Sequence, residues 1–434
     1  MLDWAGMLTS VSVTNYRSFA DPTLLELRPL TLLFGQNNSG KSALLRLLPW
    51  LADSASARSR GPLDLTSRAV RGASFAELHT RPPLSSRPEI DFTLTWATRK
   101  LDPTPISYQV TVRSFPELRR NLIRRFTVTG WGVAAEVIEL DPSFEPAAED
   151  LLYFQRPTAD ALESTSELRF SGLIPTLSPG SEGHPLRAHL AGLSEPLTEL
   201  HNGVQWLGSI RSLPEREVAF WGEPPVLISP EGGGTIELLI ADQLRDRELF
   251  PAVSSWFERH LGLRLDVEAR SDRFAVVLSP KMEPTLRVNL LDTGEGITQV
   301  LPVIAAIERA RPATAHRRLL ALEQPELHLH PAAQRTLGDY LCEVATAPDP
   351  PTLVVETHSE NLLLSVQLAA VKQRLARDRV AIYWIRSFPD GRSRAELLPL
   401  DELGHPQGWP HEVFRERLEQ SRALVSARLE LEQP

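Results

Sequence analysis

The chain has 434 residues, of which 42% are hydrophobic and 23% charged, and its formal net charge is −9. These values are typical of a globular protein and argue against one that coats nucleic acid, and the length allows one elaborated domain or two. The apolar stretches are too short to cross a bilayer, the N-terminus lacks the layout of a signal peptide, and Cys342 is the single cysteine. We therefore expect a cytoplasmic protein without membrane contact or internal disulfide.

Short apolar runs predict strands through the first third of the chain. Leu8–Val13 alternates like an edge strand, and Thr23–Leu27 and Leu30–Phe34 predict two more. A helix is expected over Ser42–Trp50. The alternating runs from Glu89 to Val137 then predict an antiparallel sheet.

The rest of the chain alternates helices and strands after a proline-rich stretch of helices and loops at residues 141–200. A strand is predicted over Val204–Ile210 and a long helical segment over Thr235–Leu261, and three short strands then lead to Leu291. Helices follow at Ile297–Arg309, Ala332–Ala345 and Glu360–Leu375, and strands at Leu319–Leu322, Thr352–Val355 and Val380–Ile385. The sequence shows no long heptad run, so no long coiled coil is expected.

A glycine-rich segment follows the predicted strand at Leu30–Phe34. Gly35–Ser42 reads GQNNSGKS and matches the pattern GxxxxGK[ST] of a phosphate-binding loop. Its glycines let backbone N–H groups point at a phosphate, and the next helix adds its dipole. Lys41 would reach the β- and γ-phosphates of ATP, and the Ser42 hydroxyl would ligate Mg²⁺. The expected nucleotide contacts are Gly35, Asn37, Asn38, Ser39, Gly40, Lys41, Ser42 and Ala43.

The segment LLALEQPELHLHP, Leu319–Pro331, ends a hydrophobic run in an acidic residue. Glu323 stands where a buried strand would deliver a carboxylate to a bound metal. Alone, it reads more readily as a strand-end carboxylate that caps a helix. The phosphate loop upstream favours the metal role. Glu326 lies three residues further on and is a second candidate for the same site.

Two more segments carry candidate phosphate contacts. His358, in VVETHSENLL, directly follows a predicted strand, where a sensor of the γ-phosphate is expected. A lone histidine is otherwise more often a hydrogen-bonded structural residue. Gly294, Gly296 and Thr298, in LLDTGEGITQ, precede a predicted helix and form another natural anion-binding end.

These segments, in this order, resemble the ABC-type ATPases of the SMC/RecF/OLD group. VTNYRSF (Val13–Phe19) is similar to an N-terminal element of that group, and it is followed by a Walker A loop, a signature-like TGEGITQ, a Walker B strand, a D-loop-like LHLHP and an H-loop-like THS. More narrowly, LGSIRSLPERE, EQPELHLHP, THSENLL and GHPQGWPHEVF resemble the small AAA-type ATPases of bacterial phage-defence operons, of the Septu- or retron-associated type.

The resemblance implies an α/β fold, namely an ABC-type P-loop ATPase head with a mixed β-sheet core, an antiparallel β subdomain and a helical lobe. Four parts are expected. Residues 1–140 would form an N-terminal ATPase lobe, 141–200 a helical insertion, 201–400 a C-terminal ATPase lobe and 401–434 a helical tail.

The resemblance also implies a homodimer that encloses ATP and Mg²⁺ between its subunits, with larger assemblies left open. Each γ-phosphate would contact Lys41 and His358 of one subunit and the Thr298 segment of the other. Arg17 and Ser18 would lie near the nucleotide. The segment Leu327–Pro331 would run along the dimer interface; its histidines, His328 and His330, could instead ligate a metal.

Gln324 departs from this pattern, because relatives usually keep a catalytic glutamate at that place. An amide cannot accept a proton from the attacking water, and general-base catalysis is worth about 10²–10⁴ in rate. Either hydrolysis is slow or Glu326 serves as the base, and we expect slow but real turnover. Gln155 is a candidate for the Q-loop glutamine.

Two functions follow from the resemblance. The first is a regulatory ATPase that controls a separate effector, expected to be a nuclease, in anti-phage defence. The alternative is a stand-alone DNA-repair ATPase like RecF, and a transporter subunit is disfavoured because the chain lacks LSGGQ. The basic cluster RRNLIRR is either a solvated face or a DNA contact; its arginines are Arg119, Arg120, Arg124 and Arg125.

Overall fold

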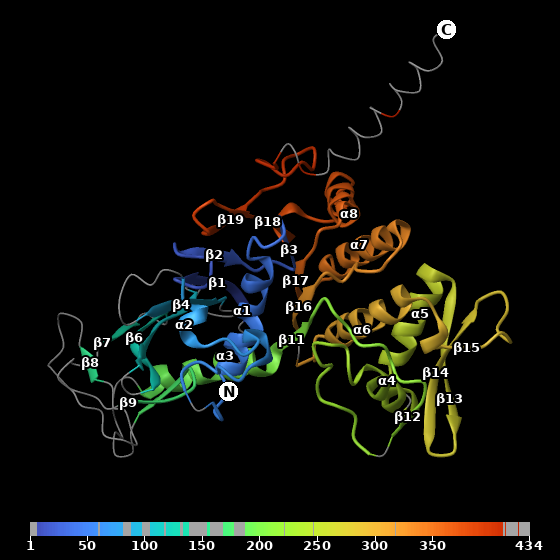
Figure 1. Ribbon diagram of the computed structural model, residues 1–434, viewed down its shortest axis with the longest axis horizontal. Coiled ribbons are helices and arrows are strands. Elements are labelled where there is room, and N and C mark those ends of the chain that lie inside the picture. Colours follow the sequence, from blue (N-terminus) through green and yellow to red (C-terminus); the bar gives the residue numbers. More distant parts are fainter. Residues whose placement is uncertain are drawn as a thin grey trace, which may run out of the picture.

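A central sheet with helices on one side and an antiparallel sheet on the other organises the computed structural model (Figure 1). The structure describes residues 7–59, 61–80, 88–97, 105–116, 119–130, 133–138, 154–156, 168–177, 187–220, 222–245, 247–316 and 318–410, with residues 413 and 424. In that part of the chain, no helix is long and apolar enough to cross a membrane.

The central sheet has six strands, in the order β11–β16–β17–β3–β18–β19. The first five run parallel, and β19 pairs antiparallel with β18. Parallel strands buried on both faces read as continuous apolar runs, which is how the sequence could reveal them. The bounds are Val204–Leu207 (β11), Leu319–Glu323 (β16), Thr352–Glu356 (β17), Leu30–Gly35 (β3), Val380–Ser387 (β18) and Ser393–Leu397 (β19).

One face of the central sheet is covered by α1 (Lys41–Ser54) and, beyond it, by a seven-stranded antiparallel sheet. Trp50 of α1 joins them, because it stacks on Tyr16 and meets Phe92 edge-on, with ring centroids 5.6 Å apart in both pairs. The strands, in spatial order, are β2 (Thr23–Glu26), β1 (Leu8–Thr14), β4 (Glu89–Trp96), β5 (Ile106–Phe115), β6 (Arg120–Gly130), β7 (Val133–Ile138) and β8 (Phe154–Arg156).

The opposite face of the central sheet packs against a helical lobe. Leu320 and Leu322 point into this second core, while Leu319 and Ala321 point into the first, as alternate residues of a strand must. The helices are α4 (Thr235–Leu244), α5 (Leu249–Leu261), α6 (Glu295–Ala310), α7 (Pro331–Ala345) and α8 (Glu360–Val371).

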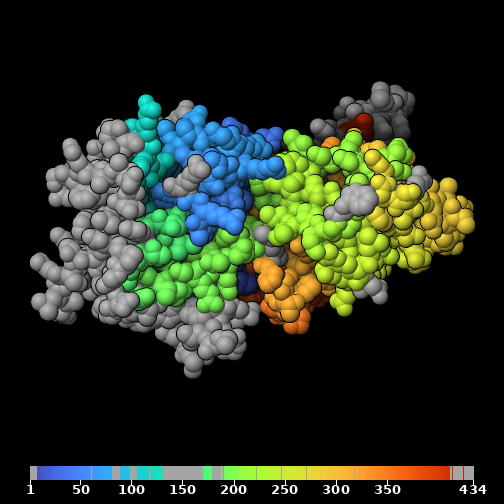
Figure 2. All heavy atoms as spheres, turned by 90° about the horizontal axis from the view of Figure 1, so that it is seen from below, coloured from blue at the N-terminus to red at the C-terminus, as the bar shows by residue number. Residues whose placement is uncertain are grey.

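A small antiparallel sheet completes the helical lobe, and its hairpin packs on α5. It contains β12 (Val218–Ala219), β13 (Leu263–Arg270), β14 (Arg273–Pro280) and β15 (Val288–Asn289). Seen from below, the yellow strands of this lobe lie at one end of the molecule, and the blue and cyan N-terminal segments lie on the other side of its middle (Figure 2).

This architecture confirms the predicted ABC-type head with a mixed core, an antiparallel subdomain and a helical lobe. The helical pattern over Thr235–Leu261 corresponds to two helices, α4 and α5, with a break between them. The break is held by Asp242, whose carboxylate accepts a 2.7 Å bond from the Phe250 backbone N–H at the start of α5. No separate strand was expected at Ser393–Leu397, where β19 edges the central sheet.

The stretch predicted as a helical insertion, residues 141–200, contains strands as well as a helix in its described part. These are β8, β9 (Leu168–Ser171) and β10 (Ile174–Leu177), followed by α3 (Arg187–Gly203), which packs on α1. Alternating short runs of this kind were obscured in the sequence by the prolines around them. The predicted tail lies largely outside the described residues, as does the side chain of Gln155.

Candidate functional site

The phosphate loop connects β3 to α1, as its sequence predicts. Gly40 precedes the helix with φ of +100°, and a Cβ there would lie 2.9 Å from the Ser18 hydroxyl and 3.0 Å from the Phe19 ring. Gly35 is equally constrained, because a Cβ would collide with the Ile385 carbonyl of β18. Glycine is therefore required at both ends of the loop, where the chain turns under the start of α1.

Lys41 and Ser42, the first residues of α1, both point at the carboxyl edge of the central sheet. The Lys41 ammonium donates to the carbonyls of Gly35 and Gln36 at 3.0 and 2.7 Å, so the loop holds its own cation in place. Burial lowers the pKa of Lys41, and the nearby Glu356 opposes that change. The Ser42 hydroxyl donates to the Glu356 carboxylate at 2.8 Å.

Glu323, the predicted metal ligand, is held by other partners. Arg46 of α1 donates to its two carboxylate oxygens at 2.6 and 2.5 Å, and Trp206 of β11 donates at 2.9 Å. Its side chain is 2% exposed. The structure therefore does not bring Glu323 to Ser42, and its role as a metal ligand stays a prediction.

Glu326, the candidate base, has one oxygen that is hydrogen-bonded and one that is buried without a hydrogen-bond partner. One carboxylate oxygen accepts from the Thr357 hydroxyl at 2.6 Å and from the His358 backbone N–H at 3.1 Å. Burial raises the pKa of Glu326. Its side chain does not line the phosphate pocket, so the geometry favours a role in fixing the Thr357–His358 turn over a role as base.

A pocket of about 650 Å³ opens over the phosphate loop. Its volume lies within the range of small-molecule sites, about 300–1,000 Å³. The predicted residues that line it are Arg17, Ser18, Asn37, Asn38, Ser39, Gly40, Lys41, Ser42, Ala43, Gln324 and His358. Burial and the charge of Lys41 lower the pKa of His358, which favours its neutral imidazole. Gly35, which was also predicted to contact the nucleotide, does not line the pocket and packs against Ile385 and Ser39.

The pocket suits a nucleotide with Mg²⁺ on several grounds. A helix N-terminus and Lys41 face it, and the Ser39 hydroxyl is fully buried without a hydrogen-bond partner. One oxygen of Glu356 is unpartnered as well. Hydroxyl and carboxylate oxygens are ligands that Mg²⁺ accepts, together with phosphate.

The signature-like segment lies elsewhere. Gly294 caps α6 and is exposed, as is Glu295. Gly296 packs so tightly on the D-loop-like segment that a Cβ would lie 2.8 Å from the His328 carbonyl. The Thr298 hydroxyl donates to the Glu295 carbonyl at 2.9 Å. None of these residues lines the phosphate pocket of their own chain.

His328 and His330 do not form a metal site within the described part of the chain, where no three His, Cys, Asp or Glu side chains cluster. His330 instead caps α7, because its ring nitrogen accepts from the Ala332 backbone N–H at 3.3 Å. The ring of His328 lies 3.6 Å from the Glu295 carboxylate. Both therefore belong to the surface shared by the signature-like and D-loop-like segments.

Three charged residues of the pocket were not expected from the sequence: Arg46, Arg71 and Glu356. Arg46 comes one turn after Ser42 on α1, so helical spacing could have indicated it. Glu356 stands two residues before His358, in the segment ETHS, and its position at the end of a buried strand was an available signal. Arg71 follows a short turn with φ of +54°, and no pattern in the sequence indicated it.

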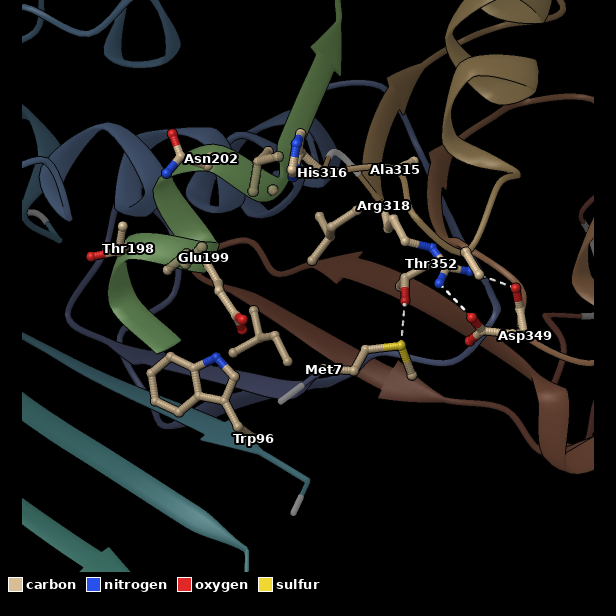
Figure 3. A pocket seen from close by; sticks show the side chains of 16 residues that line it. Met7, Trp96, Thr198, Glu199, Asn202, Ala315, His316, Arg318, Asp349 and Thr352 are labelled. Atoms are coloured by element: carbon tan, nitrogen blue, oxygen red, sulfur yellow. Dashed lines mark hydrogen bonds and ion pairs between the residues drawn. The ribbon is translucent and has the colours of Figure 1, made fainter. Parts of the chain in front are cut away.

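A second cavity, of about 370 Å³, lies at the opposite edge of the central sheet (Figure 3). Leu319 and Thr352, the first residues of β16 and β17, line it, whereas the phosphate loop lies at the other ends of these strands. Arg318 pairs with Asp349 at 2.6 Å on its wall. This cavity is therefore separate from the phosphate pocket.

Family models match two parts of the chain. Residues 7–81 match the AAA ATPase domain, and residues 246–365 match the family described as AAA domain, putative AbiEii toxin, Type IV TA system. These two parts of the chain are similar to AAA-type ATPase domains. No curated protein matches it.

Solved structures show the fold of an SMC head. The SMC head bound to the C-winged helix domain of ScpA is 12% identical, with a TM-score of 0.51 over 91% of this chain and 98% of that one. An Smc head with an extended coiled coil, derived from Pyrococcus furiosus and also bound to ScpA, is 10% identical, with a TM-score of 0.47 over 97% and 99% of the two chains. The SMC head domain from Thermotoga maritima is 12% identical, with a TM-score of 0.40 over 91% and 99%. The chain thus has the fold of an SMC head, and two of its parts are similar to AAA-type ATPase domains.

The Arg46–Glu323 pair gives a first prediction. Arg46→Met leaves the Glu323 carboxylate buried without its cation, so the free energy of unfolding should fall by about 3–5 kcal/mol. The double variant Arg46→Met/Glu323→Met should recover most of that loss. Denaturant unfolding measures both. Arg216→Met, which removes the arginine of the exposed pair with Asp292, is the control and should have little effect. If Arg46→Met lowers the free energy of unfolding no more than this control does, the buried pair does not have the proposed role.

The contacts of Glu326 give a second prediction. Glu326→Gln keeps an oxygen acceptor for Thr357 and His358, so turnover should stay close to that of the wild type. Glu326→Ala removes the acceptor and should lower kcat by about 10–100-fold while ATP still binds, because the His358 turn is misplaced. Steady-state hydrolysis and ATP affinity are measured for each. If the glutamine variant loses as much as the alanine variant, the carboxylate itself is needed and Glu326 is the base.

Proposed function

We propose that this chain is an ATP-binding, slowly hydrolysing ATPase that forms a nucleotide-bridged homodimer and controls a separate effector protein. The observation that carries the proposal is the separation of two phosphate-binding ends on one chain. The pocket over Lys41 is lined by the phosphate loop and the start of α1, while Gly294 and Glu295, at the exposed start of α6, contribute nothing to it.

A second copy of the chain would supply the missing partner of both the phosphate pocket and the signature-like start of α6. With two chains facing each other, the Gly294–Thr298 end of one subunit meets the nucleotide held by Lys41 and His358 of the other. A closed two-fold pair uses each surface twice and leaves neither unfilled. The D-loop-like segment lies directly beside the signature-like end, as Gly296 and His328 show, so it falls within the same interface. Arg17 and Ser18 line the pocket from the N-terminal lobe.

The residues of the pocket act on ATP in distinct ways. Bound Mg²⁺ would neutralise charge on the phosphates, and Ser42 is the hydroxyl placed to hold it. The loop amides and Lys41 would orient the phosphates, and His358 would donate a hydrogen bond to the γ-phosphate. Gln324 lines the pocket and can position a water, but it cannot take its proton, which supports slow turnover.

The effector role is supported by the comparisons. The model matched by residues 246–365 is described as a putative toxin of a Type IV TA system, which suits a protein of bacterial defence. The SMC head of similar fold is bound to the winged-helix domain of another protein, so a head of this shape accepts a protein partner. We infer a nuclease partner in anti-phage defence.

A RecF-like repair ATPase is the alternative, and the arginine cluster does not favour it. Arg124 pairs with Glu89 at 2.7 Å on the antiparallel sheet, and Arg113 bonds to the same carboxylate. Arginines that are paired with a carboxylate attract phosphate less than the unpaired arginines of a basic groove do.

Subunit mixing tests the shared sites. Lys41→Ala removes the phosphate cation, and Gly294→Trp adds bulk at an exposed position where a Cβ meets nothing within 4 Å. Each variant alone should lack hydrolysis, and an equal mixture should recover part of the wild-type rate, because each mixed dimer keeps one intact shared site.

Gln109→Trp, on the exposed side of β5, is the matched control and should hydrolyse ATP normally alone. Light scattering with ATP should show a dimer for the control and a monomer for Gly294→Trp. A mixture no more active than its components, from variants that fold and bind ATP as expected, would rule out shared sites.

Affinity purification from the native host tests the effector role. The protein, with and without ATP, should retain one stoichiometric enzyme whose binding depends on nucleotide, identified by mass spectrometry and assayed for nuclease activity. Lys41→Ala is the control, because it should no longer respond to ATP. Recovery of DNA and repair factors alone would favour the RecF-like alternative.

A further inference from the structure

The hydroxyl that should ligate Mg²⁺ touches a glutamate that the Walker pattern does not predict. Ser42 donates to Glu356 at 2.8 Å, and Glu356 ends β17, which lies between β3 and β16. In register, Glu356 pairs with Leu33 of β3 on one side and with Glu323 on the other. Neighbouring strands lie about 4.8 Å apart. The phosphate loop follows β3, so Glu356 is on the adjacent strand and Glu323 is one strand further away.

Glu356 also has an oxygen without a hydrogen-bond partner, on a side chain that faces the pocket. Its side chain lines the phosphate pocket, the residue is 4% exposed, and one of its oxygens has no hydrogen-bond partner. A buried, unpartnered carboxylate oxygen is costly unless something binds it. Glu323 is as deeply buried, but Arg46 and Trp206 use its oxygens and its side chain does not line the pocket.

We propose that Glu356, and not Glu323, is the carboxylate that holds the Mg²⁺ of bound ATP together with Ser42. The assignment rests on the proposed ATP function. Mg²⁺ prefers oxygen ligands, and it usually takes only one or two protein carboxylates, with phosphates and water filling the other positions. Glu323 is then a structural anion that anchors Arg46 and α1 to the sheet.

The surrounding charges agree with this assignment. Burial raises the pKa of Glu356, as does the negative charge of Glu323, while the Ser42 hydrogen bond, Lys41 and Arg46 oppose the rise. A divalent cation beside Glu356 would relieve both the burial and the repulsion between the two carboxylates. The same cation beside Glu323 would have to displace a paired arginine.

Two isosteric variants separate the candidates. Glu356→Gln and Glu323→Gln each remove one charge and keep the side-chain shape. The affinity for a fluorescent ATP analogue is measured with Mg²⁺ and with EDTA, and Mn²⁺ bound with ATP is followed by electron paramagnetic resonance. In Glu356→Gln, the gain in affinity from Mg²⁺ should fall by about tenfold or more, and the spectrum of bound Mn²⁺ should change.

Glu323→Gln should keep the wild-type response to Mg²⁺ and the wild-type Mn²⁺ spectrum, and it should lose thermal stability because Arg46 loses its anion. The reverse result, with metal response lost in Glu323→Gln and kept in Glu356→Gln, would overturn the assignment while leaving the ATPase proposal intact. A wild-type protein that binds no ATP analogue under either condition would instead remove the proposed function. Thermal unfolding of both variants shows that each is folded.

Discussion

The buried ion pair between Arg46 and Glu323 fixes the arrangement on which the site depends. It joins α1, whose first turn forms the phosphate cradle, to β16 of the central sheet through two short hydrogen bonds. Trp206 adds a third bond from β11, so three elements distant in sequence meet at one carboxylate. Removing one partner of such a pair leaves a buried charge, so helix and sheet are held in one relative position. The phosphate loop connects β3 to α1, so its position is fixed as well.

A second buried arginine connects this carboxyl edge to the signature-like helix. Arg211 donates to the backbone carbonyls of Glu323 and Gln324 at 2.8 and 3.3 Å, and to that of Gln299 at 3.3 Å. The Gln299 amide returns a 2.8 Å bond to the Arg211 carbonyl. A displacement of α6 must therefore move the guanidinium or break these bonds. In the proposed dimer, contact with a second copy at Gly294 and occupancy of the phosphate pocket would both act on the turn that Arg211 holds.

The elements and the phosphate loop could be predicted because their signals are local. The apolar runs at Leu30–Phe34, Leu319–Leu322 and Thr352–Val355 became β3, β16 and β17, and GQNNSGKS became the loop expected from it. The order of these strands in space is not local. Nothing in the sequence places β17 between β3 and β16, so the nearer glutamate, Glu356, could not be separated from Glu323.

The partners of Glu323 were hidden for the same reason. Arg46 and Trp206 lie far from it in sequence, and each would read as an ordinary residue of its own helix or strand. The acid after a buried strand therefore indicated a metal ligand, although a buried cation was already opposite it. Glu326 was misplaced more locally, because the turn after β16 directs its side chain towards Thr357 rather than into the pocket.

If Glu356 holds the metal, there is a physical reason for a glutamine at position 324, where relatives usually have a catalytic glutamate. Gln324 adopts φ of +41°, and its backbone N–H donates to the Glu356 carbonyl at 2.8 Å, so the two residues are adjacent at the edge of the sheet. A glutamate at 324 would add a third carboxylate beside Glu323 and Glu356, where Arg46 is already paired and burial raises the pKa of Glu356. Like charges in a buried site disfavour each other's ionisation. A neutral amide at 324 keeps a hydrogen-bonding group in the pocket without that repulsion, so acid at 356 and amide at 324 are complementary choices at one site.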